Sequence, residues 1–562
     1  MTGSTQQISK MRTSSILLSA AISSFSVGVI ASLPPIIDTA PPLSFVFLLS
    51  ESLDGRLFRE GSAAKIPNIR ALLSSGSVTF DSAYSNDPVC APSRSSLFSG
   101  RAPHKIPHQH NGMLVGGVWN NYEGLDANYS TRMDQLLGNA GYHVQLTGKM
   151  DVTVGSHTES CRLESLTFNV AWPYNITENG GWNQETDMCS TQGTISPGGT
   201  AGSTGSAFPD DWKSITETAA FAATAPQPFF AYAGTSILHP PYQTTQYWYD
   251  VAAEQVLPEW PSLSDVHPCD LQSIMKRGCS PSEANTSAFN DPVRVARVRR
   301  IYLSELEEWD AMVGTVVAAV TKAGRLNTTV FVLAADHGDM QLDHQLFYKM
   351  VPYDASSRIP LAFAWTGISG ARSITQPAQL LDIFPTLLSL AQQPVPSYAD
   401  GFDLTPYLKG ASNDPSRPLF VAIQNHDEDI SSSWFAVCNG THKYVVYGDG
   451  QQVPPQLFNL IDDGVEMVNL APSSPADVAL LDTALLSLIN YPAVAMEVAT
   501  YQKAQLRYWQ ANSADWKKEA ASLRWSPGWS AYPQLSLDAL ESYLKNDTIA
   551  ILPCNGALAA NT

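Results

Sequence analysis

Positive charge is scarce in this chain of 562 residues, in which 33 lysines and arginines stand against 52 aspartates and glutamates. The formal net charge of −19 argues against nucleic acid or an acidic membrane surface as a partner, because polyanions select basic proteins. An anionic substrate would have to be held by a local basic pocket. Internal repeats and low-complexity blocks are also absent, and 44% of the residues are apolar. The chain is therefore predicted to be globular, with one large domain and a smaller one.

Long apolar runs are missing except near the N-terminus. Lys10 and Arg12 precede an uncharged stretch from Thr13 to Ile37 that is rich in Ser, Ala, Ile and Val. This arrangement is typical of a secretory signal peptide, which we place at residues 1–33 with cleavage near Ala31. An uncleaved signal anchor is the alternative, because the run is long enough to span a bilayer. We expect entry into the secretory pathway and no stable membrane association.

Six Asn-x-Ser/Thr sequons agree with this route, because they are acceptors for N-glycosylation in secreted proteins. They lie at Asn128, Asn175, Asn285, Asn327, Asn439 and Asn546.

Apolar strand-like segments alternate with amphipathic helices through most of the chain. Residues 44–49 form a continuous apolar run, as expected of a buried parallel strand. A long helix is predicted over 293–323, where apolar residues recur at helical spacing until Gly324 ends it. This alternation predicts an α/β fold with a mostly parallel sheet sandwiched by helices. Further helices are predicted at 66–75 and 132–139, and further strands at 78–81, 142–146, 229–233 and 329–335.

Residues able to perform chemistry follow several of the predicted strands. Ligands of such sheets bind beyond the carboxyl ends of the strands, which lie at one edge. We therefore expect one shared site at that edge, formed by Glu51, Lys149, His239, Asp336 and His337.

The pattern changes after residue 425. Residues 434–437 and 443–447 flank Asn439-Gly440, a dipeptide typical of a tight turn, and they predict a hairpin. We expect a smaller antiparallel-sheet subdomain with a terminal helix at 426–554, beside a catalytic domain at 43–425.

The segment from Cys90 to Arg101 reads Cys-Ala-Pro-Ser-Arg-Ser-Ser-Leu-Phe-Ser-Gly-Arg. It resembles the signature C-x-P-S-R-x-x-L-x-[ST]-G-R of the type I sulfatases, whose fold is similar to that of alkaline phosphatase. In that family a formylglycine-generating enzyme oxidises the cysteine to formylglycine, and the hydrated aldehyde attacks sulfate esters. The resemblance implies that Cys90 is the precursor of the nucleophile and that Arg94 stands beside an anionic site. A buried structural cysteine is the alternative for a lone Cys.

A metal motif of the same family is also present. Asp336-His337-Gly338 resembles its D-[HN]-G sequence, and Glu51 stands where most members carry paired aspartates. A hard divalent cation can polarise sulfate and activate the nucleophile, and we expect Ca²⁺. If Glu51 is no ligand, Asp54 is the next candidate. The resemblance implies one set of metal ligands, namely Glu51, Cys90, Asp336 and His337.

The residues expected to contact sulfate belong to three further motifs. Gly148-Lys149 resembles the Gly-Lys motif of the family, and Lys349 stands in a run similar to its E-H-x-x-x-x-K segment. Both lysines would bind sulfate as compact positive charges. His239-Pro240 resembles the segment whose histidine protonates the leaving oxygen. The predicted catalytic residues are thus Cys90, Arg94, Lys149, His239 and Lys349.

Two positions depart from most of the family. Ser50-Glu51-Ser52 replaces the paired aspartates, and Asp151 replaces a histidine, for which His157 is the nearest stand-in as a substrate-binding residue. Both departures are similar to one lysosomal branch that removes 2-O-sulfate from glucuronate. The resemblance implies a sulfated carbohydrate substrate, most specifically 2-O-sulfated glucuronate of glycosaminoglycan-type glycans, and a lysosomal or secreted protein. The other matching stretches are 50–57, 148–151, 343–350 and 523–525.

Two other functions remain open at this point. A phosphoester or phosphonate hydrolase could use the same fold, because phosphate and sulfate sites share architecture. A non-catalytic glycan-binding protein could have lost activity through Glu51.

The chain has seven cysteines, so six remain when Cys90 is set aside. An even number in an oxidising compartment predicts up to three disulfides. We expect the pairs Cys269–Cys279, Cys161–Cys189 and, by elimination, Cys438–Cys554.

Overall fold

The computed structural model of the chain describes residues 42–110, 113–121, 123–126, 129–153, 193–197, 205–255, 266–276, 291–411, 420–425 and 433–512, with a few more between 541 and 549. All of them belong to one unit, Pro42–Thr562. The predicted signal peptide and His157 lie outside the described residues.

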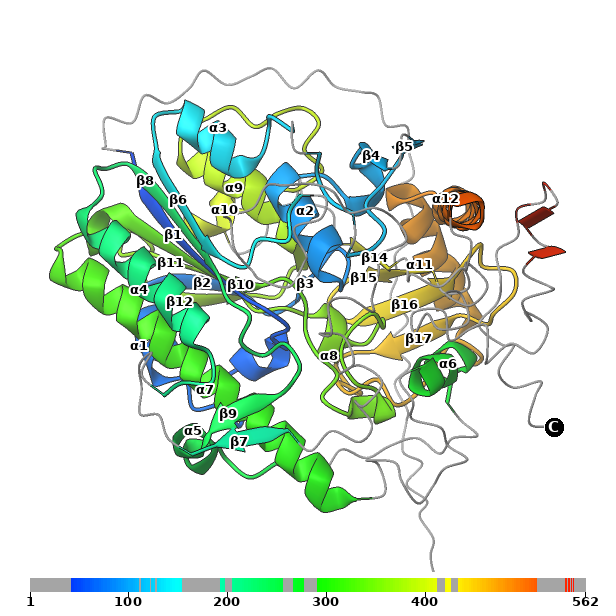
Figure 1. Cartoon of the computed structure of the whole chain (residues 1–562), viewed down its shortest axis with the longest axis horizontal. Coiled ribbons are helices and arrows are strands. Elements are labelled where there is room, and N and C mark those ends of the chain that lie inside the picture. Colours follow the sequence, from blue (N-terminus) through cyan, green and yellow to red (C-terminus); the bar gives the residue numbers. More distant parts are fainter. Residues whose placement is uncertain are drawn as a thin grey trace, which may run out of the picture. The chain divides into compact units, whose positions relative to one another are not determined.

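A seven-stranded sheet runs through the centre of this unit in the order β12-β2-β11-β10-β1-β8-β6 (Figure 1). Neighbouring strands are parallel except that β11 is antiparallel to both β10 and β2. The predicted mostly parallel sheet is confirmed, with one reversed strand inside it. The strands are β1 (Ser44–Ser50), β2 (Ser77–Phe80), β6 (His143–Gly148), β8 (Phe229–Gly234), β10 (Thr329–Ala335), β11 (Leu361–Ala364) and β12 (Ala371–Ile374).

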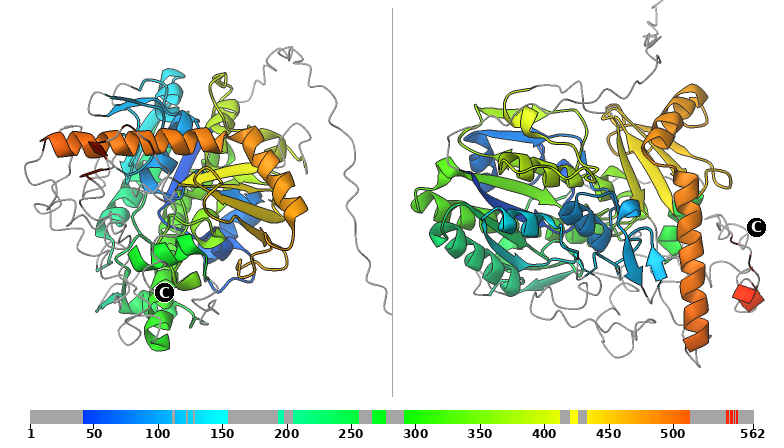
Figure 2. Two further views of the ribbon diagram at one scale, coloured as in Figure 1. Left: turned by 90° about the vertical axis from the view of Figure 1, so that its right-hand side faces the viewer. Right: turned by 90° about the horizontal axis from the view of Figure 1, so that it is seen from above.

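Helices cover both faces of the sheet, which explains why β1, β8 and β10 are buried along their whole length (Figures 1 and 2). One layer contains α1 (Pro67–Ser74), α4 (Pro209–Thr224) and α7 (Pro292–Lys322). The other contains α2 (Cys90–Ser99), α3 (Met133–Asn139), α9 (Ile383–Leu390) and α10 (Thr405–Leu408).

The long helix α7 begins and ends where its sequence indicates. The side chain of Asp291 accepts hydrogen bonds from the backbone N–H groups of Val293 and Arg294 at 3.0 and 3.2 Å, so it caps the helix. Gly324, at φ +71°, follows the last turn. The apolar side chains on its inner face, Trp309 among them, are fully buried against the rest of the molecule.

Shorter elements complete the described part of the large sheet domain. They are η1 (Gly55–Phe58), β3 (Ala83–Tyr84), η2 (Pro103–Lys105), β4 (His108–His110), β5 (Met113–Val115), β7 (Thr194–Ser196), β9 (Gln243–Thr245), α5 (Gln246–Val251), α6 (Pro268–Lys276), η5 (Leu326–Thr328), η6 (Asp343–Gln345), α8 (Asp354–Ser357), β13 (Ala378–Gln379) and η7 (Leu380–Asp382).

The predicted antiparallel sheet near the C-terminus is confirmed. Its strands β14 (Val421–Asn425), β15 (Trp434–Cys438), β16 (His442–Tyr447) and β17 (Gln456–Asn459) pair in sequence order. Alternate residues of β15 face opposite sides of the sheet. Cys438 faces the main core, whereas Phe435 and Val437 pack against α11 (Pro475–Leu488) and α12 (Tyr491–Asn512).

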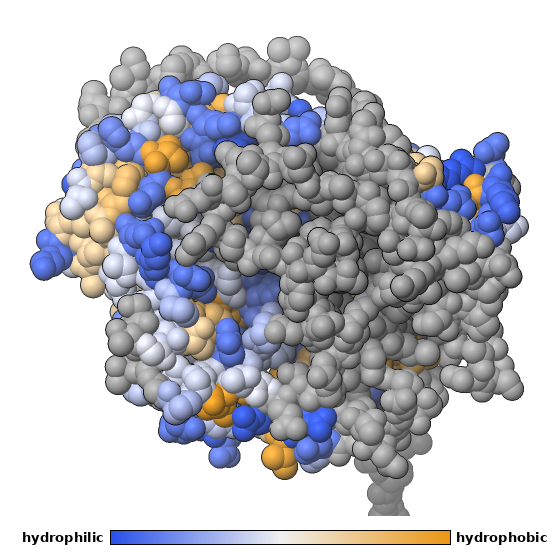
Figure 3. Space-filling model, in the orientation of Figure 1, coloured by the Kyte–Doolittle hydropathy of each residue, from blue (hydrophilic) through white to orange (hydrophobic). Residues whose placement is uncertain are grey.

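Among the described helices, none is by itself long and apolar enough to cross a membrane. Helix α11 and the first part of α12, up to Tyr501, meet that criterion only as a pair bent by 61°. On the face shown in Figure 3, hydrophilic and hydrophobic residues are interspersed over the described surface.

The predicted pairing of Cys438 with Cys554 is wrong. Cys438 is a free, buried thiol whose Sγ lies 3.1 Å from the hydroxyl of Tyr84. Cys438 lies on the inward face of β15, so its side chain points into the core and not toward a disulfide partner. Cys269 is disulfide-bonded. Its predicted partner Cys279 and the predicted pair Cys161–Cys189 lie outside the described residues.

Candidate active site

The strands of the central sheet end in register at one edge. Ser50 of β1 pairs with Ala335 of β10, and Gly234 of β8 pairs with both Leu49 and Gly148. The residues that follow these strand ends, Glu51, Lys149 and Asp336 among them, therefore leave the sheet side by side.

Glycine is required where β6 and β8 end. A Cβ on Gly148 would lie 1.9 Å from the carbonyl oxygen of Gly234, and Gly148 has φ +70°. A side chain here would push the two strand ends apart and displace Lys149 from the site.

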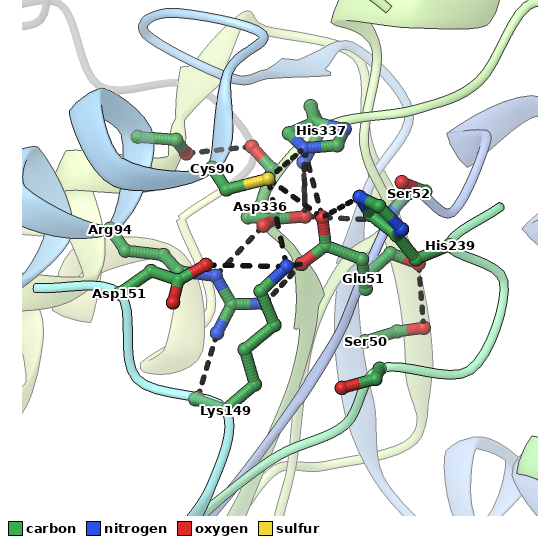
Figure 4. Close-up of polar contacts among 12 residues, drawn as sticks. Ser50, Glu51, Ser52, Cys90, Arg94, Lys149, Asp151, His239, Asp336 and His337 are labelled. Atoms are coloured by element: carbon green, nitrogen blue, oxygen red, sulfur yellow. Dashed lines mark hydrogen bonds and ion pairs between the residues drawn. The ribbon is translucent and has the colours of Figure 1, made fainter. Parts of the chain in front are cut away.

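Cys90 is the first residue of α2, and the N-terminus of this helix faces the sheet edge (Figure 4). Its Sγ lies 2.9 Å from Oε1 of Glu51, 2.6 Å from Nζ of Lys349, 3.5 Å from Nε2 of His337 and 3.6 Å from Nζ of Lys149. The thiol is fully buried. Burial, and then the charge of Glu51, raise the pKa of Cys90, so an unmodified thiol would stay protonated.

Two hydrogen bonds between α2 and its neighbours fix the start of this helix. The amide oxygen of Asn121 accepts a hydrogen bond at 3.0 Å from the N–H of Ala91. The hydroxyl of Ser93 donates at 2.7 Å to the carbonyl oxygen of Asp336. These contacts hold the start of the helix, and with it Cys90, against the strand ends.

Glu51 is the centre of a buried cluster of positive charges. Its Oε2 lies 2.7 Å from Nη2 of Arg94 and 2.9 Å from Nζ of Lys149, and its Oε1 lies 3.4 Å from Nζ of Lys349. Burial opposes ionisation, but Lys149, Lys349 and Arg94 together hold the pKa of Glu51 well below its usual value. The carboxylate is therefore charged and organises the cations around it.

Arg94 connects several groups of the site. Its Nε donates to Oδ2 of Asp336 at 2.8 Å, and its Nη1 donates to the carbonyl oxygen of Lys149 and to the hydroxyl of Tyr232 at 2.9 and 3.0 Å. The guanidinium is fully buried and its described partners do not include Sγ of Cys90. The structure thus gives Arg94 a positioning role toward Glu51 and Asp336.

Four predicted metal ligands lie together. Donor atoms of Glu51, Cys90, Asp336 and His337 are within 4.8 Å of one another, and all four residues are buried. His337 Nδ1 lies 2.9 Å from the carbonyl oxygen of Gly338, and its Nε2 lies 3.3 Å from Oε1 of Glu51. A cation between these donors would stabilise this arrangement, and the carboxylate-rich set suits a hard divalent ion. The residues present therefore fit a metal.

His239 lies on the loop after β8, at the rim of the same site. Its Nδ1 is 2.6 Å from the carbonyl oxygen of Pro240, and its Nε2 is 2.6 Å from the hydroxyl of Tyr348. Burial, and then the charges of Lys349 and Lys149, hold the pKa of His239 well below its usual value. The ring is therefore neutral, with its proton on Nδ1 and Nε2 accepting from Tyr348.

Tyr348 belongs to the matching stretch 343–350, but the sequence assigned it no role. It precedes Lys349, but no spacing rule connects it with a histidine more than a hundred residues earlier. Its backbone has φ +74°, and Asp151 and Leu238, which flank Lys149 and His239, have φ +46° and +78°. Non-glycine residues in this region are strained, and such strain concentrates at functional sites.

Asp211 of α4 is a second residue that only the structure reveals. Its carboxylate accepts hydrogen bonds from the backbone N–H groups of Ser236 and Ile237 at 2.9 and 2.8 Å, and so it fixes the loop that carries His239. Burial raises the pKa of Asp211 to about 7, although the two N–H groups lower it.

This raised pKa predicts a pH dependence of stability. The folded state holds the Asp211 proton up to about pH 7, whereas the unfolded chain releases it at about pH 4. The stabilising contribution is thus fully present in acid and is lost as the pH rises through about 7. We expect a larger fall in melting temperature between pH 6 and pH 8, roughly spanning this titration, for the wild type than for Asp211→Asn. Equal falls in both proteins would contradict the assignment.

The structure also places several acidic residues close to the site. Asp151 lies 3.2 Å from Nζ of Lys149, so the departure from the family puts a carboxylate beside this lysine. Asp54 binds Arg56 at 2.8 Å and is not part of the Glu51 cluster. Asp354 and Arg358, which follow Lys349 in the chain, pair at 3.0 Å and so brace the segment after this lysine.

Comparison with known proteins agrees with this geometry. A family model described as Sulfatase matches residues 44–393. The chain belongs to the sulfatase family. Arylsulfatase K of Xenopus laevis is 31% identical over 534 residues, which cover 90% of this chain and 94% of that protein. Arylsulfatase K of Homo sapiens is 30% identical, with 89% and 92% covered. This sulfatase is therefore an enzyme that hydrolyses sulfate esters.

Solved structures share the fold of this sulfatase. A 2-O GAG sulfatase superposes with a TM-score of 0.58 at 22% identity, covering 80% of this chain and 92% of the other. A phosphonate monoester hydrolase from Silicibacter pomeroyi superposes with a TM-score of 0.59 at 21% identity, covering 79% and 94%. These likenesses establish the sulfatase fold and do not by themselves separate sulfate from phosphonate chemistry.

Proposed function

We propose that this sulfatase removes sulfate from a sulfated sugar, 2-O-sulfated glucuronate of glycosaminoglycan-type glycans, with formylglycine derived from Cys90 and one Ca²⁺. The observation that supports it most directly is the position of Cys90. The residue starts a helix whose N-terminus faces three other metal-donor side chains and two lysine ammonium groups at the carboxyl edge of the sheet.

Glu51, Asp336, His337 and the modified Cys90 would hold the cation. When bound, the cation supplies positive charge that polarises the sulfate and favours a deprotonated nucleophile. Formylglycine would place an oxygen nucleophile where the thiol of Cys90 now stands, after action of a formylglycine-generating enzyme during maturation.

The lysines bind the sulfate group. Lys349 is the closest described cation to the Cys90 side chain, at 2.6 Å, and Lys149 lies 3.6 Å from it on another side. Two ammonium groups around one reacting atom can neutralise oxygens of a sulfate placed there, because compact cations in a buried site interact strongly.

His239 acts on the leaving sugar oxygen. The charges of Lys349 and Lys149 hold its pKa down, so an anionic sulfate bound to these lysines would raise it again and favour a proton on Nε2. Tyr348 holds Nε2 in place at 2.6 Å until the substrate arrives. Protonation of the leaving alcohol is a role that imidazole fills near neutral or mildly acidic pH.

The choice of sugar is supported by similarity. Arylsulfatase K proteins match about nine-tenths of the chain, and a 2-O GAG sulfatase is among the structural neighbours. An acidic compartment such as the lysosome, or secretion, fits the predicted signal peptide and the sequons. Asn327 and Asn439 are the described sequons, and Asn327 is exposed.

The test compares matched substrates on the purified, secreted protein. A disaccharide that ends in 2-O-sulfated glucuronate should release sulfate, whereas one that carries only 6-O-sulfated glucosamine should not. An aryl sulfate should turn over faster than the matched aryl phosphate. Mass spectrometry of the Cys90 peptide should show formylglycine. Faster turnover of the phosphate ester would contradict sulfate chemistry, and release from the second disaccharide alone would contradict the sugar.

Glu51 gives the sharpest test of the metal site. Glu51→Asp should keep measurable activity, because calcium accepts about 6–8 oxygens in flexible geometry at roughly 2.3–2.6 Å. Glu51→Gln should lose calcium affinity and melt at a lower temperature. The neutral glutamine would leave Arg94, Lys149 and Lys349 without the carboxylate that they now share.

Calcium titration by calorimetry, together with melting curves, measures both effects. Asp54→Asn is the matched control, because Asp54 is a buried carboxylate that binds Arg56 outside the cluster. If Glu51→Gln binds calcium as the wild type does, Glu51 is no ligand.

A further inference from the structure

A cavity of about 1200 Å³ lies between the β2–β12 edge of the central sheet and the turn between β15 and β16. Strands β12 and β2 lie at the end of the central sheet opposite to β6. The walls come from η1, α1, strands β2 and β12, the segment 375–377 and the turn 439–441. None of the residues of the Cys90 centre lines it. Pockets for a drug-sized molecule measure about 300–1,000 Å³, so this cavity can hold a longer ligand.

The lining of this cavity is basic, although the whole chain is strongly acidic. Among the described residues that line it, the charged ones are two acids, Glu60 and Asp81, and four arginines. The net charge of the chain is −19, so this local excess of positive charge stands out from the average surface. The arginines are Arg59, Arg70, Arg358 and Arg372.

Three of the arginines have no carboxylate partner within ion-pair distance among the described residues. The guanidinium of Arg70 donates to the carbonyl oxygens of Phe58 and Arg59 at 2.5 and 2.7 Å. Arg372 donates to the carbonyl oxygen of Tyr407 at 2.6 Å, and its buried Nε has no hydrogen-bond partner. Backbone carbonyls do not neutralise a full positive charge, so these guanidinium groups keep theirs.

Arg59 is the most available of them. It is exposed at the mouth of the cavity, and its guanidinium makes no hydrogen bond or ion pair within the described part of the chain. Burial of part of the side chain, and then the charge of Arg358, lower the pKa of Arg59. Positive charges that repel one another across a cavity favour the binding of an anion between them.

The remaining walls suit a sugar. Ser373, Thr375 and Phe58 are among the residues that line the cavity, and Ser373 and Thr375 are exposed. Hydroxyls can exchange hydrogen bonds with sugar hydroxyls, and an aromatic ring offers an apolar surface to the face of a sugar. Arginine forks bind sulfate or carboxylate oxygens in pairs.

We propose that this cavity is a second glycan-binding site, separate from the Cys90 centre, which holds a sulfated or carboxylated stretch of an oligosaccharide through Arg59, Arg70 and Arg372. The choice of a glycan among anions rests on the proposed function, because the substrate proposed there is the end of such a chain.

Calorimetry with a defined probe tests the proposal. The probe is a sulfated hexasaccharide without 2-O-sulfated uronate, so that the Cys90 centre has no group to process, and its desulfated counterpart is the comparison. Arg59→Glu should weaken binding of the sulfated probe by at least about fivefold, the scale of one exposed charge contact. Ser373→Glu, which adds a carboxylate at an exposed position and removes no side-chain hydrogen bond to any described residue, should weaken it similarly.

Lys213→Glu is the matched control. It makes the same change of charge on α4, where the lysine side chain is 64% exposed and does not line the cavity. Binding by this variant should stay within about twofold of the wild type. Binding by Arg59→Glu and Ser373→Glu that equals the control, or binding of the desulfated probe as tight as that of the sulfated one, would overturn the proposal.

Aryl sulfate hydrolysis separates this proposal from the proposed function. All three variants should hydrolyse an aryl sulfate as the wild type does, because none of them alters the Cys90 centre. Failure of the wild type to release 2-O-sulfate from glucuronate would count against the proposed function, whereas the binding comparison among the variants would still decide the second site.

Discussion

Cys90→Ser will abolish hydrolysis of sulfate esters and leave the fold intact. Serine has nearly the same size, and it suits the first turn of a helix. The Cys90 segment resembles the sequence that a formylglycine-generating enzyme modifies, and this modification requires a thiol. A serine hydroxyl also lacks the second oxygen that releases sulfate. The measurement is turnover of an aryl sulfate, with the melting temperature as the check on folding.

Cys438→Ser is the control that this chain offers. Cys438 is the other free, buried cysteine in the described part, and its Sγ contacts Tyr84 rather than the site. This variant should keep wild-type turnover. More than a trace of activity in Cys90→Ser would show that Cys90 is not the precursor of the nucleophile.

Lys349→Ala will lower kcat/KM for the same substrate by about 10²–10³. Its Nζ lies 2.6 Å from Sγ of Cys90, the position proposed for the reacting atom, and the side chain is fully buried. A donor of this kind aimed at developing charge is worth about 2.7–4 kcal/mol in the transition state. Lys149→Ala should show a loss of the same order, because Lys149 reaches the atom from another side.

Lys105→Ala is the control for the loss of a lysine. Its ammonium pairs with Asp400 at 2.7 Å with the side chain 47% exposed, and such surface pairs contribute little to stability. Its kinetics should equal those of the wild type. Wild-type kinetics in Lys349→Ala would show that this lysine lies outside the reacting centre. A large fall in melting temperature would show that the lost activity reflects impaired folding.

Local patterns in the sequence were sufficient to predict the elements of the fold and the position of the site. The apolar run 44–49 and the helix over 293–323 were predicted from residues that are neighbours in the chain, and β1 and α7 confirm them. The Asn439-Gly440 turn predicted the β15–β16 hairpin in the same way. Because strand ends share one edge of a parallel sheet, Glu51, Lys149 and Asp336 could be expected together, and the structure brings them together.

Contacts between segments far apart in the chain were decided by tertiary structure alone. Nothing local marks β11 as the reversed strand, since its direction depends on how the chain returns to the sheet after the Lys349 loop. The pairing of Cys438 with Cys554 was predicted by elimination, and the free thiol of Cys438 contradicts it. Strand register decides which face of β15 carries Cys438, and local sequence does not show this.

The partners of the chemical groups were likewise outside the reach of the sequence. Tyr348 reaches His239, and Asp211 holds the loop of the same histidine, only because the central sheet brings α4 and two distant loops to one edge. The arginines of the second cavity come from the end of η1, from α1, from β12 and from the loop before β11, for the same reason. Local sequence sets helix and strand, which depend on near neighbours, whereas the charge and hydrogen bonds of a site depend on register and packing across the whole chain.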